Sequence, residues 1–136
     1  MLALFVRDRY YPKLDCLRLL KMLILHEFGE TGKAGDITPT DGITAKEKHR
    51  MEKETVIALF KDFPNGESYI ALWEEFEEGK TNEARLAKAI DKLEMCMQAK
   101  IYSLQHNKDL QEFFDRAREQ MQFSEVLALF EEVEKI

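Results

Sequence analysis

The sequence predicts an all-α fold, and three observations lead to this prediction. Apolar residues recur at helical spacing along most of the 136 residues. Runs that alternate apolar and polar residues, which are typical of strands, are nearly missing. Glycine, proline and capping residues fall where helices begin and end. We therefore expect a single helical domain over 1–136, with helices of unequal length.

The N-terminal part is expected to hold two helices and a long loop. The first helix, from Leu2 to about Arg9, stops before Pro12, because the residue before a proline disfavours helical backbone. The second, Lys13–Phe28, is apolar nearly all round near its end, so it should be a central helix. Gly29–Gly42 contains four glycines and has the length of a functional loop.

Five further helices complete the predicted fold, over 44–60, 67–78, 82–104, 109–121 and 124–134. Thr44 and Glu47 form the capping-box pattern at the start of the first of these. Gly79 ends the second, and Thr81 or Asn82 caps the third. The apolar side chains expected to face the core are Leu17, Leu20, Leu23, Ile24, Phe28, Met51, Val56, Leu59, Phe60, Ile70, Leu72, Trp73, Phe76, Leu86, Ile90, Leu93, Met97, Ile101 and Leu104.

Composition narrows the range of partners. The net charge is −6, and lysine and arginine are scattered among acidic residues, so neither duplex nucleic acid nor an anionic membrane is an expected partner. A small phosphorylated ligand fits, because a metal ion can supply positive charge locally. Cys16 and Cys96 each lie in an apolar run and are expected to be buried thiols of a cytoplasmic protein, not a disulfide.

The most unusual stretch is the end of the second predicted helix. The apolar run Leu17–Leu25 leads directly into His26, Glu27 and Glu30, and the loop behind it carries Asp36. Imidazole and carboxylate together suit a divalent metal such as Mn, Fe, Co, Ni or Zn. We therefore expect a metal site or an acid–base site here.

Asp91 is a second polar residue in an unusual position, because it lies at the edge of the apolar face of the long predicted helix. A buried aspartate is costly unless it is paired or metal-bound. Ordinary explanations also stand: Asp91 can pair with Lys88 or Lys92, and the helix dipole alone favours His26 at a C-terminus. The two glutamates near His26 can simply be solvated.

Two other polar stretches are expected to face solvent. His49 and His106 lie in strongly polar segments, and the acidic run Glu74–Glu78 is expected to be a solvated face in which Phe76 is a core anchor.

Four strings occur in one order between about Leu17 and Gln98. They are His26-Glu27-x-x-Glu30, Gly35-Asp36-Ile37-Thr38-Pro39, Leu72-Trp73-x-Glu75-Phe76 and Ile90-Asp91-Lys92-Leu93-Glu94. Together they resemble the HD-domain family of 5′-deoxynucleotidase-like phosphohydrolases.

The resemblance implies an all-α HD domain that holds a divalent metal ion, whether Mn, Co, Fe, Ni, Zn or Mg. His26 and Glu27 match the family's His-Asp pair, and Asp91 matches its last metal ligand. Glu30 matches the general acid for the leaving sugar oxygen, and Asp36 matches the loop residue that positions the attacking water or the substrate. The implied reaction is hydrolysis of a nucleoside 5′-monophosphate to nucleoside and phosphate.

This chain departs from the family pattern in three places. The pair is His-Glu, the loop before Gly35 is one residue longer, and no histidine precedes His26, where the family has its first ligand. We therefore expect the family's first helix and first ligand to be missing, which exposes apolar surface around Leu2 and Phe5 and favours a homodimer. The alternative to an enzyme is an impaired HD-like module that binds metal or nucleotide, or only dimerises.

Overall fold

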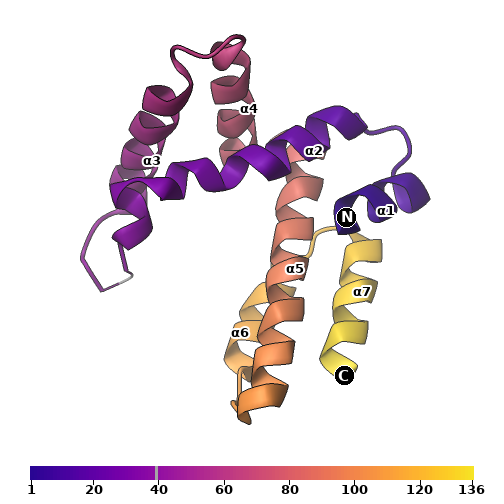
Figure 1. Ribbon diagram of the computed structural model, residues 1–136. Coiled ribbons are helices and arrows are strands. Elements are labelled where there is room, and N and C mark those ends of the chain that lie inside the picture. Colours follow the sequence, from indigo (N-terminus) through magenta and orange to yellow (C-terminus); the bar gives the residue numbers. More distant parts are fainter. Residues whose placement is uncertain (39) are drawn as a thin grey trace.

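The computed structural model describes residues 1–38 and 40–136, and the fold in this part of the chain is all-α, as predicted (Figure 1). It consists of seven α-helices and two short 3₁₀ helices, without a strand among the described residues. The elements are α1 (Leu2–Tyr10), α2 (Cys16–Leu25), η1 (His26–Thr31), η2 (Lys33–Asp36), α3 (Ala45–Phe60), α4 (Gly66–Glu78), α5 (Asn82–His106), α6 (Gln111–Arg118) and α7 (Ser124–Lys135).

The predicted helix caps are largely confirmed. The Thr44 hydroxyl accepts a hydrogen bond from the Glu47 backbone N–H at 3.2 Å, and the Glu47 carboxylate accepts one from the Thr44 N–H at 3.0 Å. Thr81, not Asn82, caps α5, because its hydroxyl accepts from the Ala84 N–H. Gly79 ends α4 in the left-handed conformation, at φ 62°.

The prediction of one α-helix through Phe28 is wrong. α2 ends at Leu25, and the chain tightens into the two 3₁₀ turns η1 and η2. The physical reason is close packing of these turns against α3. A Cβ on Gly29 would lie 3.0 Å from Glu52 Cβ, and a Cβ on Gly32 would lie 2.3 Å from Thr55 Oγ1.

Two apolar clusters hold the helices together. The larger one is built around α5, with side chains from α1, α2, α6 and α7 packed on it. The smaller one joins the end of α2 to α3 and α4 through Leu25, Val56, Phe60 and Trp73. In Figure 1, α2 crosses the top of α5 and continues toward the α3–α4 pair. The last turn of α2 therefore lies where the two clusters meet.

Several apolar side chains that were expected in the core are exposed. They are Leu17, Ile24, Leu59, Met97, Ile101 and Leu104. On α2 and on the second half of α5, other helices cover only part of the circumference. The spacing of apolar residues along one helix does not reveal how much of it other helices will cover. Met97 and Ile101 line a groove of about 490 Å³, together with residues of α1 and α2.

None of the described helices combines the length and the apolar character needed to span a bilayer.

The two cysteines differ in environment. Cys96 is fully buried, and burial raises the pKa of its thiol to about 11. Cys16 is half-exposed at the start of α2, so the expectation of two buried thiols is wrong for Cys16.

The thiolate is the reactive form of cysteine. We therefore predict that, at pH 8, an aromatic disulfide reagent modifies Cys16 quickly and Cys96 only as fast as the chain unfolds. Cys16→Ser should abolish the fast phase, and urea should expose Cys96; a fast phase that survives in Cys16→Ser would contradict the burial of Cys96.

Candidate active site

His26 is held from three sides at the C-terminus of α2. Its backbone carbonyl accepts a hydrogen bond from the Trp73 indole N–H at 3.2 Å. Its ring Nδ1 lies 2.7 Å from the carbonyl oxygen of Leu23. Its ring also packs on Phe76, with the two centroids 4.6 Å apart. Contacts with α2 and α4 thus fix the direction in which Nε2 points.

Nε2 of His26 faces Asp91 on α5, at 3.3 Å from the carboxylate oxygen Oδ1. Because a carbonyl oxygen only accepts hydrogen bonds, Nδ1 must carry the proton that bonds to Leu23. In a neutral imidazole Nε2 is then a bare lone pair directed at a carboxylate. This arrangement is stable only with a positive charge there, either a proton on Nε2 or a metal ion shared by the two side chains.

Lysine does not neutralise Asp91 in this fold. Among the described residues, neither Lys88 nor Lys92 lies within 4.0 Å of its carboxylate, so the expected pairing with them is wrong. Burial lowers the pKa of His26, but the contacts with Asp91 and with the Leu23 carbonyl raise it, and the net pKa lies above its ordinary value. Without a metal, His26 is therefore the partner of Asp91.

A pocket of about 230 Å³ opens beside this pair, and its charge is strongly negative. Five carboxylates line it, those of Glu27, Glu30, Glu52, Glu77 and Asp91, together with His26, Phe76 and Met95. Lys48 pairs with two of these carboxylates, with its ammonium 3.5 Å from Glu30 and 3.4 Å from Glu52. So many carboxylates around one small space favour the binding of a cation.

On α3 and α4, charged side chains that the sequence did not single out lie in or next to the pocket. Glu52 on α3 is only 8% exposed, and burial together with the charge of Glu52 raises the pKa of Glu77 on α4. His49 stacks on Trp73 and lies 3.8 Å from both Glu74 and Glu77. The prediction of a solvated Glu74–Glu78 run is therefore wrong for Glu74, Glu75 and Glu77, which are half-buried, and His49 is half-buried where it was expected to be exposed.

These residues include a group that can hold a metal ion. Ligand atoms of His49, Glu52 and Glu77 all lie within 4.8 Å of one another, and no other such trio of histidine, cysteine or acidic side chains occurs in the described part of the chain. The ligand atoms of Glu27, His26 and Asp91 do not all lie within 4.8 Å of one another, although all three residues line the pocket. Helical spacing could have placed His49 with Glu52, and Trp73 with Glu77, on shared helix faces, but not shown that these faces are covered.

The loop residues take different positions. Glu30 lines the pocket from η1, but Asp36 is exposed at the end of η2 and is not among the pocket residues. Gly35, within η2, packs closely against η1, because a Cβ there would lie 2.0 Å from the backbone oxygen of Glu30. Pro39, the last residue of the Gly35–Pro39 string, lies outside the described residues.

Comparison with known sequences settles the family. The HD domain profile matches residues 1–128. The chain belongs to the HD-domain family. In the structure, His26 at the end of α2 lies 3.3 Å from Asp91 of α5.

Several similar proteins of this family carry a 5′-deoxynucleotidase name. The 5′-deoxynucleotidase HDDC2 of Dictyostelium discoideum is 39% identical over 113 residues, which are 78% of this chain and 59% of that protein. The bovine (Bos taurus) protein of the same name is 33% identical over 138 aligned positions, which cover 98% of this chain and 65% of the relative. The yeast (Saccharomyces cerevisiae) 5′-deoxynucleotidase YGK1 is 35% identical over 119 residues, covering 82% of this chain and 54% of the relative. The chain thus spans 54% to 65% of the length of these three relatives.

We predict that Gly35→Ala perturbs the site by displacing Glu30. The added methyl group meets the Glu30 backbone oxygen, and such overpacking typically costs about 1–3 kcal/mol. Urea unfolding should show this loss, whereas Lys33→Ala, an exposed change in the same turn, should stay within about 0.5 kcal/mol of the unmodified chain. Equal stability of the two variants would contradict the close approach of Gly35 to Glu30.

Proposed function

We propose that this chain is a metal-dependent phosphohydrolase that releases phosphate from nucleoside 5′-monophosphates, with deoxynucleotides among its substrates. The observation that carries the proposal is the 3.3 Å separation between Nε2 of His26 and the carboxylate of Asp91, in a chain of the HD-domain family. The 5′-deoxynucleotidase names of similar proteins support the choice of substrate.

His26 and Asp91 would hold the divalent metal ion, with Glu27 as a third ligand from the pocket rim. The donor set fits such an ion, because imidazole and carboxylate suit Mn, Co, Fe, Ni and Zn, and carboxylate also suits Mg. The 3.3 Å separation of Nε2 and Oδ1 agrees with two ligands that each lie about 2.0–2.2 Å from one ion. When bound, the metal supplies charge neutralisation for the phosphoryl group and lowers the pKa of a coordinated water.

The charge of the pocket supports a bound cation independently of the family. A phosphate monoester carries negative charge, and a pocket lined by five carboxylates repels it. Lys48 offsets part of this charge through Glu30 and Glu52. A divalent ion on the His26–Asp91 side would offset more and would make that side the place where phosphate binds.

The remaining roles belong to two acidic residues. Glu30 would protonate the leaving 5′ oxygen, and its support is its place in the pocket beside His26. Asp36 would position the attacking water or the substrate, and its support is the resemblance of the Gly35–Pro39 string alone. Its exposed position at the end of η2 makes it the weaker of the two assignments.

We predict that two substitutions separate these roles. Glu30→Gln should lower phosphate release by about 10²–10⁴-fold, the typical value of a positioned general acid, and should keep the bound metal. Asp91→Asn should lose metal and activity together. The measurements are phosphate release from a panel of nucleoside 5′-monophosphates and elemental analysis of the purified chain.

His49→Gln is the matched control, because it removes a ligand of the other candidate metal group and leaves the His26–Asp91 pair intact. It should retain both metal and activity. If His49→Gln lost the metal and Asp91→Asn kept it, the ion would belong to His49, Glu52 and Glu77. If the unmodified chain bound metal but released no phosphate from any nucleotide, the enzyme proposal would fail.

We further propose that the protein is a cytoplasmic homodimer. The support is its free cysteines and the apolar side chains that stay exposed, among them Phe5 and Ile24. Sedimentation velocity should detect a dimer whose population rises with protein concentration. A chain that stays monomeric at high concentration would contradict this assignment.

A further inference from the structure

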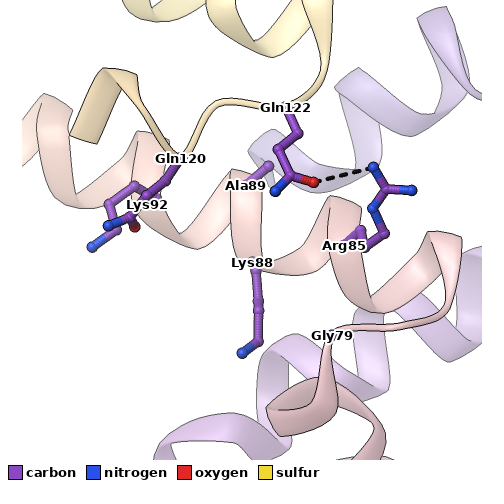
Figure 2. Close-up of a pocket in the computed structure, with 7 residues that line it drawn as sticks. All are labelled: Gly79, Arg85, Lys88, Ala89, Lys92, Gln120 and Gln122. Atoms are coloured by element: carbon purple, nitrogen blue, oxygen red, sulfur yellow. Dashed lines mark hydrogen bonds between the residues drawn. The ribbon is translucent and has the colours of Figure 1, made fainter. Parts of the chain in front are cut away.

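A second pocket, of about 170 Å³, lies between the end of α4, the first half of α5 and the segment that connects α6 to α7 (Figure 2). It shares no lining residue with the pocket beside His26. Its lining residues are Gly79, Arg85, Lys88, Ala89, Lys92, Gln120 and Gln122.

The charge of this pocket is opposite to that of the chain as a whole. The chain has a net charge of −6, yet the pocket is lined by three cationic side chains and by no carboxylate. Arg85, Lys88 and Lys92 follow one another at spacings of three and four, which places them on one face of α5. Like charges at these spacings destabilise a helix unless an anion offsets them.

No acidic side chain supplies that anion. In the described part of the chain, no carboxylate lies within 4.0 Å of the charged nitrogens of Arg85, Lys88 or Lys92. Arg85 donates to the side-chain oxygen of Gln122 at 3.1 Å, as Figure 2 shows. Lys88 donates to the backbone oxygen of Glu77 at 2.8 Å. These bonds are to neutral acceptors, so none of the three cations forms an ion pair, although the charge of Lys88 opposes the rise in the pKa of Glu77.

The hydrogen-bonding groups around the pocket are mainly donors. A guanidinium carries five N–H groups, an ammonium three and a primary amide two, and one bond each from Arg85 and Lys88 leaves most of them free. Arginine and lysine are the usual ligands of phosphate oxygens. At roughly 30 Å³ for each water in the liquid, the volume of about 170 Å³ holds five or six waters, which is room for a phosphate group.

We propose that this pocket is a binding site for a phosphate group, either inorganic phosphate or the phosphate of a small phosphomonoester. Arg85 binds the phosphate oxygens from α5 on the side of the pocket where Gln122 lies, and Lys88 and Lys92 add positive charge from the same helix (Figure 2). Gln120 and Gln122 complete the site from the connection between α6 and α7. The site does not depend on the proposed enzymatic activity, because the two pockets are lined by different residues.

The test is a titration of the ¹⁵N-labelled full chain with inorganic phosphate, followed by backbone amide shifts at ionic strength matched with chloride. The amides of Gly79, Ala89, Gln120 and Gln122 should shift in a saturable manner. The double variant Arg85→Gln/Lys92→Gln should bind phosphate at least about tenfold more weakly, because the hydrogen bond from a charged guanidinium typically contributes at least one factor of ten.

The matched control is Lys46→Gln/Lys61→Gln, which removes the same charge from exposed positions on and next to α3. It should bind phosphate like the unmodified chain. Equal weakening in both double variants would mean that only the net charge matters, and it would overturn the proposal. Absence of saturable shifts at the four amides, or shifts confined to His26 and Asp91, would overturn it as well.

Two more ligands distinguish the sources of the phosphate group. A methylenephosphonate analogue of a nucleoside 5′-monophosphate, which lacks the hydrolysable ester bond, should shift the same four amides if small phosphomonoesters are ligands. A preference for inorganic phosphate alone identifies the free ion as the ligand. The nucleoside without phosphate should leave these amides unchanged; if it shifted them, recognition would not be of phosphate and the proposal would fail.

Discussion

The hydrogen bond between the His26 ring and the Leu23 carbonyl decides how the candidate active site is arranged. Leu23 lies in the last turn of α2, where carbonyl groups have no partner within the helix. The ring of His26 supplies that partner at 2.7 Å and is turned so that its other nitrogen faces Asp91. If α2 continued as a regular helix, the Leu23 carbonyl would be used by the backbone. The early end of α2 is therefore a condition for the orientation of His26 toward Asp91.

Close approach of the 3₁₀ turns to α3 explains why α2 ends there. Gly29 and Gly32 have no room for a side chain against Glu52, Trp73 and Thr55. This contact brings the buried carboxylate of Glu52 to the pocket, where Lys48 offsets part of the cost of its burial. On α4, Trp73 contributes to the smaller cluster and also donates to the His26 carbonyl. The same contacts thus hold the smaller cluster together and orient the site.

The sequence predicts features that are local in the chain and misses those that depend on a distant neighbour. The capping box at Thr44 and the glycine end of α4 were predictable because the interacting groups are within a few residues. The polar end of the Leu17–Leu25 run also marked His26 correctly as an unusual position. The partner of Asp91 was not predictable from spacing, which offered the nearby lysines, because His26 reaches it from another helix.

The burial of charged side chains was also not predictable from the sequence, because it depends on helices that are distant along the chain. Helical spacing places Glu52 and His49 on one face of α3, but only the packing of α3 against α4 and η1 shows that this face is covered. The opposite error occurs at Met97, Ile101 and Leu104, whose apolar spacing was regular although no helix covers them fully. Periodicity identifies the face that can be buried, and tertiary contacts decide whether it is.

The separation of charge across the fold follows from how α5 is surrounded. Asp91 faces the end of α2, where it adds to a pocket of five carboxylates, whereas Arg85, Lys88 and Lys92 line the pocket against the connection between α6 and α7. Lys88 lines the basic pocket and also lies near the acidic one. Its ammonium is 5.3 Å from the centre of the Phe76 ring, and that ring packs on His26. Attraction of this cation to the aromatic face helps to hold α4 on α5 without placing a positive charge in the acidic pocket. Lys48 and His26 offset only part of the charge of the carboxylates in the acidic pocket, so its charge stays negative and favours a cation.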